Sequence, residues 1–457
     1  MSSTIKRNKY EIDMCNGTIM DKLISFSLPL MLSGILQLMF NAVDIIVIGR
    51  FSGSQSLAAV GSTTALINMF TNLFIGISLG ANVLSARFYA AGKDKEMSET
   101  VHTAITLALI SGIIMVFVGL IFAKPVLELM DTPDDVINLS TLYMRIYFMG
   151  MPFFMLYNYG ASILRAVGDT KRPLFYLIVA GIANAGLNMC LVIIFHLGVA
   201  GVAIGTVISQ LISSILVLRC LYRSETSYQL HFSKLKIQKE YLKQIFQVGI
   251  PAGIQSTVIN YSNVLLQSSV NSFGSIAMAG YTAANNIFGF LYVTVNAVTQ
   301  ACMSFTSQNY GVGKWKRMDR VLIDCLILSF VAMMILGNSA YFFGPKLLTI
   351  YTSNSKVIQC GMEILLYTTV TYFLCGFMDL FPGALSGIGR SGVPMSLSII
   401  GTVGTRIVWI FWIFPNHRSL DILFISYPAS WIITIVLQVI CYYFVRKQLY
   451  AKMRAEA

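Results

Sequence analysis

Apolar runs of about 20 residues recur along the whole chain, and a bilayer core about 30 Å thick requires about that many in each transmembrane helix. Of the 457 residues, 56% are hydrophobic and only 11% are charged. This composition excludes a soluble globular domain of the same size. We therefore expect an integral membrane protein that lies in a lipid bilayer.

The runs have helical length, and they lack the ten-residue alternation of a membrane β-barrel. They predict an all-α integral membrane protein with twelve transmembrane helices. The first six spans are expected near residues 23–48, 57–84, 101–122, 139–163, 174–196 and 199–221. The second six are expected near residues 245–271, 279–307, 321–343, 361–388, 394–414 and 422–445.

The second half of the sequence repeats the first half. Pro29 pairs with Pro251 at an offset of 222 residues, and Tyr89 pairs with Tyr310 at an offset of 221. The stretch AAGKDKEM then lies on GVGKWKRM. Because a shared period indicates a shared structural unit, each half is expected to form one similar bundle.

Each half holds an even number of spans, so both halves enter the membrane from the same side. Repeats of this kind typically face each other across a cavity and expose it alternately to the two sides. We predict two pseudo-symmetric six-helix lobes around a central cavity. The lobes comprise residues 1–221 and 244–457, and residues 222–243 form a cytoplasmic inter-lobe linker.

Basic residues concentrate in alternate connections between the spans. The expected inner segments hold about 25 Lys and Arg, against about five in the outer segments. Because cytoplasmic loops carry the excess of Lys and Arg, both termini are predicted to be cytoplasmic, in a multi-pass protein of the cell membrane. The net charge of +12 therefore reflects topology, and no nucleic-acid partner is expected.

Several motifs occur in order and at the repeat spacing. The first half contains LPLMLSGILQLMFNAVDIIVIGRF, LAAVG, ILRAVGDTKRP and GVAGVAIGTVIS, and the second contains GIPAGIQSTV and GFMDLFPGALSGIGRSGVP. Over nearly its whole length the chain thus resembles the multidrug and toxic compound extrusion (MATE) transporters. The resemblance implies an antiporter that exports organic, often cationic compounds in exchange for H⁺ or Na⁺. We expect a monomer with no cofactor beyond the coupling ion.

Asp44 is a carboxylate within an apolar span, where insertion costs about 2.5 to 3.5 kcal/mol. It matches the acid that the resembled family carries in its first span. The family's remaining first-half ligands match Asn184, Asn188 and Thr206, although Asn188 replaces an Asp. Carboxylate, amide and hydroxyl oxygens suit a hard cation such as Na⁺, and a desolvated carboxyl group suits a proton. In the alternative, Asp44 caps a helix and the two amides serve only interhelical packing.

Asp379 matches an acid that the family uses for cation coupling or substrate binding in the second half. Its usual partner there is a Glu on the first span of that half, where this chain has Asn260 and no Glu. Arg406 is a candidate partner for Asp379, because an unpaired internal charge is costly. Either the two residues form a structural pair, or they act in substrate binding or gating.

Four further polar residues are candidates for lining the cavity, with interhelical hydrogen bonding as the alternative: Gln37, Asn41, Gln255 and Asn263. The sequence contains no nucleotide motif, catalytic triad or metal-ligand cluster, so it predicts a transporter and no enzyme. The alternative function is a flippase for a lipid-linked glycan or another lipid-like substrate. A flippase of this kind requires several basic cavity residues, and only Arg145 and Arg406 lie within spans.

Overall fold

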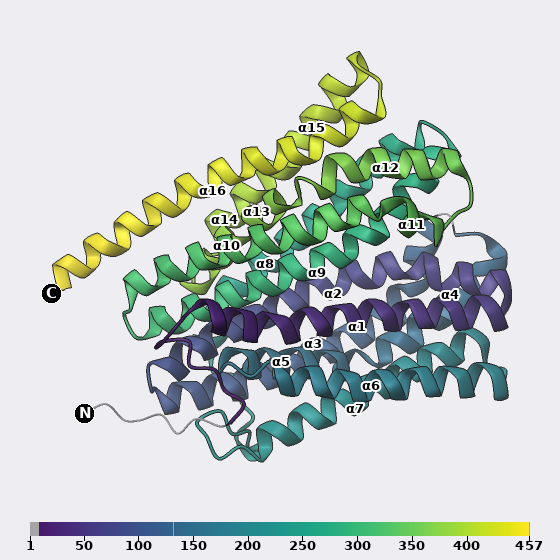
Figure 1. The fold of residues 1–457 in the computed structure, drawn as a ribbon. Helices are drawn as coiled ribbons and strands as arrows, with labels where there is room; N and C mark the ends of the chain where they lie inside the picture. The colour runs from purple at the N-terminus through teal and green to yellow at the C-terminus, as the bar shows by residue number, and fades with distance from the viewer. Residues whose placement is uncertain (1–8, 131, 457) are drawn as a thin grey trace. The chain divides into compact units, whose positions relative to one another are not determined.

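The structure is a computed structural model that describes residues 9–130 and 132–456. The first eight residues, which belong to the predicted inner segments, lie outside the described part. Within the described ranges every regular element is helical (Figure 1). The predicted all-α fold is therefore confirmed.

The helices of the first half correspond to the six expected spans of that half. Their bounds are α1 (Met20–Phe51), α2 (Gly53–Ala90), α3 (Asp94–Leu129), α4 (Asp134–Met149), α5 (Met151–Ala166), α6 (Lys171–Met189) with the π-helix Cys190–Ile194, and α7 (Gly198–Tyr222). A short 3₁₀ turn, Phe232–Lys234, follows in the connection to the second half.

The second half repeats this order. Its elements are α8 (Lys239–Asn271), α9 (Ser275–Gly311), α10 (Trp315–Phe342), α11 (Gly344–Thr349), α12 (Ser355–Thr369), α13 (Tyr372–Gly387), α14 (Gly392–Ser398), the π-helix Ile399–Gly404, α15 (Thr405–Val408), the π-helix Trp409–Ile413, the 3₁₀ turn Phe414–Asn416, and α16 (Leu420–Glu456).

Among the described residues, nine helices are long and apolar enough to cross a membrane, or ten when the bent pair α12 and α13 counts as one span. The two other expected spans correspond to α8 and to the pair α4 and α5. Helix α8 is long enough but rich in Ser, Asn and Gln, whereas α4 and α5 have 16 residues each. Each of the twelve expected spans thus has a counterpart.

Two expected single spans are broken helices. The span expected at 139–163 is interrupted at Gly150, and Pro152 occupies the first turn of the next helix, where its missing N–H costs nothing. The span expected at 361–388 bends by 44° between α12 and α13. Length and hydropathy do not reveal such breaks, because both pieces are apolar.

The contacts divide the chain into two compact units. The first unit comprises Met1–Asp13 and Leu28–Gly253, and the second comprises Met14–Ser27 and Ile254–Ala457. Each unit has its own apolar core. The connection after α7 packs on the first unit, because Tyr228 and Leu230 are fully buried there and the His231 backbone N–H donates to His102 Nε2 at 3.0 Å.

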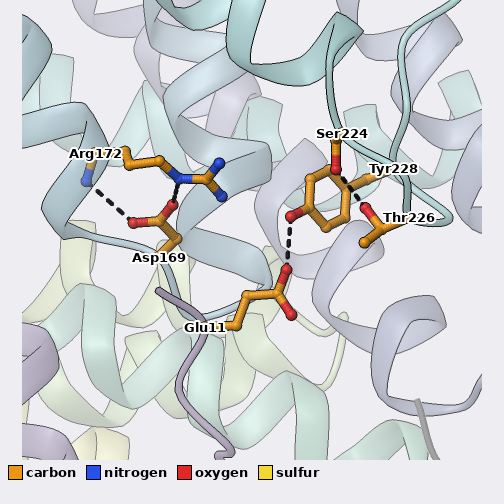
Figure 2. A network of polar contacts seen from close by, with 6 residues as sticks. All are labelled: Glu11, Asp169, Arg172, Ser224, Thr226 and Tyr228. Atoms are coloured by element: carbon orange, nitrogen blue, oxygen red, sulfur yellow. Dashed lines mark hydrogen bonds and ion pairs between the residues drawn. The ribbon is translucent and has the colours of Figure 1, made fainter. Parts of the chain in front are cut away.

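A polar network closes the turn between α5 and α6 in the first unit (Figure 2). Gly168 adopts a positive φ of 96°, and Asp169 accepts hydrogen bonds from the Arg172 backbone N–H at 3.1 Å and from its guanidinium. Tyr228 donates to Glu11 at 2.6 Å. Burial raises the pKa of the Tyr228 phenol, so this group stays protonated and remains a donor.

Candidate functional site

Asp44 lies in α1 and its side chain is buried, with an exposed fraction of 9%. One helical turn earlier, the Phe40 ring lies directly against Gly181 of α6. Any side chain at Gly181 would overlap this ring, so the glycine permits the close approach of α1 to α6. This approach brings the carboxylate of Asp44 next to the polar face of α6.

That polar face consists of Asn184 and Asn188, which are four residues apart on α6 and both buried. Residues at this spacing lie on one face of a helix. The Asn188 amide N–H donates to Asp44 Oδ1 and also lies 3.3 Å from Asn184 Oδ1. The two amides therefore form one unit with the carboxylate.

Thr206 of α7 completes the cluster. Its hydroxyl donates to Asp44 Oδ2 at 3.5 Å and accepts from Asn184 Nδ2 at 3.4 Å. The four residues that the sequence singled out in the first half thus lie together in one unit of the structure. Each oxygen of the carboxylate has its own donor, which fixes the orientation of the carboxyl group.

The Asn188 amide has a further feature. Its oxygen is buried without a hydrogen-bond partner among the described residues, and it faces Gly205 of α7, where a side chain would overlap it. The cluster therefore holds carboxylate, amide and hydroxyl oxygens around one formal charge, which is a suitable donor set for a proton or a monovalent hard cation. Within the described residues no group of three or more His, Cys, Asp or Glu is placed to hold a metal.

Three residues near the cluster escaped the sequence analysis. Tyr143 and Tyr147 of α4 lie within electrostatic range of Asp44, and Gln210 of α7 lies close to Tyr147. Gln210 follows Thr206 by four residues, so its spacing placed it on the same helix face. The tyrosines had no comparable signal, because only tertiary packing brings α4 to this position.

In the second half, Asp379 and Arg406 form no ion pair within the described part of the chain. Asp379 is half-buried on α13, near Tyr292 of α9. Arg406 instead donates to Asn263 Oδ1 at 2.7 Å and to Ser262 Oγ at 3.2 Å. The structural pair considered from the sequence is therefore not present in this structure.

The remaining candidates have different environments. Gln255 is half-buried on α8, and three side chains are exposed: Gln37 and Asn41 on α1, and Asn260 on α8. Asn263 alone among the four further polar candidates contacts a charged group of the site. The polar residues of α1 and α8 thus remain candidates for contact with a transported molecule.

The chain matches the family described as MatE twice, over residues 29–190 and over residues 251–412. It is 29% identical over 434 residues to the probable multidrug resistance protein YoeA of Bacillus subtilis (strain 168), with 93% of each chain covered. It is 24% identical over 379 residues to the multidrug export protein MepA of Staphylococcus aureus (strain NCTC 8325 / PS 47), with 82% of this chain and 83% of that protein covered.

The fold is also similar to solved structures. The outward-facing structure of a multidrug resistance MATE family transporter matches 98% of this chain and 100% of that chain with a TM-score of 0.88, at 20% identity. The two segments that match the MatE family coincide with the two halves of the internal repeat. Together with the fold, they show that this chain is a multi-pass membrane transporter, not an enzyme, and that it belongs to the MATE family.

Proposed function

We propose that the chain exports organic, amphipathic cations from the cell in exchange for H⁺ or Na⁺, with Asp44 as the coupling residue. The observation that carries the proposal is the buried Asp44 carboxylate held by Asn188 and Thr206. An ionisable group within a membrane span is costly and is a functional candidate for that reason.

Coupling requires that the inward-moving ion and the exported compound favour different states of the transporter. In this proposal a proton or Na⁺ neutralises Asp44 in one state, and the carboxylate loses that ion in the other. The hydrogen bonds from Asn188 and Thr206 hold the empty carboxylate, because they satisfy its two oxygens after the ion has left.

The two coupling ions place different demands on the cluster. A proton needs only one oxygen of Asp44, so the amides can stay as they are. A Na⁺ ion needs several oxygen ligands, and the Asn188 amide presents its N–H group to Asp44. Sodium coupling therefore requires this amide to turn its oxygen toward the ion, whereas proton coupling does not.

The substrate class rests on two observations. The relatives are named as multidrug resistance and multidrug export proteins. Exposed or half-buried polar side chains on α1 and α8 offer hydrogen-bonding groups to a transported molecule: Gln37, Asn41, Gln255, Asn260 and Asn263. We assign substrate contact to these residues and to Asp379 and Arg406 of the second half, in a transport cycle of alternating access.

We place the protein in the cytoplasmic membrane with both termini in the cytoplasm, on the basis of its basic connections. A monomer suffices for the coupling step, because the complete Asp44 cluster lies within one half of one chain.

The test is uptake of the fluorescent cation ethidium into proteoliposomes, with Na⁺ and pH gradients imposed separately. We compare wild type with Asp44→Asn, which removes the charge and retains the shape of the side chain. The matched control is Asp134→Asn, the same change at an exposed carboxylate in the first turn of α4.

The expected result is that one of the two gradients accelerates ethidium transport in wild type and Asp134→Asn, and that neither gradient does so in Asp44→Asn. Gradient-driven transport that persists fully in Asp44→Asn would contradict the assignment. Flipping of a lipid-linked sugar without any ethidium transport would instead favour the flippase.

A further inference from the structure

Arg406 is a buried positive charge in the middle of the span Gly392–Asn416, with an exposed fraction of 2%. It lies in α15, a single helical turn between the π-helices Ile399–Gly404 and Trp409–Ile413. Segments of π-helix are rare, and they occur frequently at functional sites. A guanidinium in the middle of a span cannot reach the membrane surface as one near a helix end does.

The groups that contact this guanidinium in the described part of the chain are formally neutral. Its Nη1 donates to the Asn263 amide oxygen at 2.7 Å and to the Ser262 hydroxyl at 3.2 Å, and its Cζ lies 4.7 Å from the Tyr427 ring centroid. The Tyr427 hydroxyl in turn lies 2.9 Å from the Tyr281 hydroxyl. These contacts orient the side chain, but none of them supplies a negative charge.

The guanidinium also retains an unused donor. Its Nε is buried and has no hydrogen-bond partner among the described residues. The other ionisable side chains within electrostatic range are Cys375 and Tyr372, which are neutral at their ordinary pKa values near physiological pH. No carboxylate in the described ranges forms an ion pair with Arg406. A buried charge of this kind is unfavourable unless a counter-charge joins it.

The internal repeat relates this site to the Asp44 cluster. Asp44 lies on the first span of its half and is bonded from the fifth and sixth spans, by Asn188 and Thr206. Arg406 lies on the fifth span of its half and is contacted from the first span by Asn263 and from the sixth by Tyr427. The same three spans of each half thus surround one buried charge, which is negative in the first half and positive in the second.

We propose that Arg406, with Asn263 and Ser262, forms an anion-binding site of the second half, which takes a carboxylate or phosphate group of the transported compound. The substrate is then a zwitterion that carries such a group beside its cationic part. The identity of the bound compound rests on the proposed export function, whereas the anion site itself does not. A free inorganic anion such as chloride carries the same negative charge and is the alternative occupant of the site.

The residues of α8 next to the site are partly accessible. Asn263 is half-buried, and Asn260, one turn before it, is exposed. An incoming carboxylate takes the place of the Asn263 amide oxygen on Nη1. The free Nε–H lies on the other edge of the planar guanidinium and is a second donor for an anion. Asn263 can then turn its amide N–H toward the bound anion.

The experiment uses a pair of fluorescent probes that differ in one group. Rhodamine 110 carries a free carboxylate, and rhodamine 123 is its methyl ester and lacks that charge. We measure binding of each to the purified full-length protein by fluorescence anisotropy in chloride-free buffer. Wild type is expected to bind rhodamine 110 roughly tenfold more tightly than rhodamine 123, because a desolvated charge pair contributes at least this much.

Two variants test the role of Arg406. Arg406→Gln is expected to remove the preference for rhodamine 110 while rhodamine 123 still binds. Asn263→Asp places a carboxylate at the position that now bonds to Nη1, so it fills the site internally and is expected to remove the preference without leaving a buried charge unpaired. This second variant keeps the test valid if Arg406→Gln fails to fold.

Chloride distinguishes the two sources. If chloride raises the thermal stability of wild type but not of Asn263→Asp, and rhodamine 110 shows no preference, the site exists and its occupant is a free anion. A wild type that neither discriminates the two rhodamines nor responds to chloride would overturn the proposal, as would a preference that persists in both variants. Asp44→Asn separates the two proposals, because it is expected to abolish gradient-driven transport and to retain the rhodamine preference.

Discussion

Asn188 donates its side-chain amide to the Asp44 carboxylate, and this hydrogen bond joins the fifth span of the first half to the first span. The bond is local to one half of the molecule. Binding of an ion at Asp44 therefore acts directly on the packing of α1 against α6.

The side-chain amides of Asn184 and Asn188 on α6 are expected to contribute unequally to gradient-driven transport. Asn188 bonds directly to Asp44, whereas Asn184 reaches it only through Thr206 and Asn188. A hydrogen bond to a charged group contributes about 1.5 to 3 kcal/mol. Asn188→Ala should therefore reduce gradient-driven ethidium transport about tenfold or more, and Asn184→Ala should reduce it less. Equal losses, or a larger loss in Asn184→Ala, would contradict the geometry.

A methyl group at Gly205 should disturb coupling without removing any ligand. The new Cβ would overlap the Asn188 amide oxygen, so the amide must rotate away from Asp44. Gly205→Ala is thus expected to mimic Asn188→Ala in the proteoliposome assay. The control is Gly186→Ala on α6, where a Cβ meets nothing within 4 Å. If Gly205→Ala transports ethidium like Gly186→Ala and wild type, the orientation of the Asn188 amide does not matter for coupling.

The contact between Phe40 and Gly181 should set the distance between α1 and α6. Gly181→Ala is expected to lower both protein stability and coupling, because overpacking of a close contact costs about 1 to 3 kcal/mol. Adding Phe40→Leu to Gly181→Ala should restore part of the loss, which a thermal unfolding series in detergent measures. A double variant no better than Gly181→Ala would show that the ring is not the obstacle.

The hydrogen bond between Tyr228 and Glu11 should contribute to the stability of the first unit, and this contribution is independent of transport. Tyr228→Phe leaves the Glu11 carboxylate without the donor that lies 2.6 Å away, and Tyr89 remains as a second donor at 2.6 Å. The expected loss is about 1 to 3 kcal/mol in the free energy of unfolding. Tyr222→Phe is the control, because this ring is exposed and stacks on Phe232. A smaller loss in Tyr228→Phe than in the control would contradict this role.

Much of the fold could be predicted from the sequence, because length, apolarity and repetition dominate a membrane protein. The breaks at Gly150 and between α12 and α13 could not, since apolar residues continue through them. The π-helices around Arg406 belong to the same class, because a locally widened helix leaves no mark on hydropathy. Arg406, which lies between them, contacts Ser262 and Asn263.

Part of the candidate site could likewise be predicted from the sequence, and part of it could not. Asp44 stands out as a carboxylate within an apolar span, and the family resemblance added Asn184, Asn188 and Thr206. The helical spacing of Asn184 and Asn188 then places both amides on one face. The grouping of all four residues in one unit is what the structure adds. The role of Gly205 and the approach of Tyr143 depend on tertiary contacts that no local pattern contains.

The exchange of ions at Asp44 is tested most directly by ion release on substrate binding in detergent. Tetraphenylphosphonium is added to the purified protein, and released H⁺ is followed with a pH dye and released Na⁺ with a radioactive tracer. Because linked binding is reciprocal, wild type should release about one cation per bound substrate. Asp44→Asn should release none while still binding tetraphenylphosphonium. Equal release by both proteins would contradict the central claim.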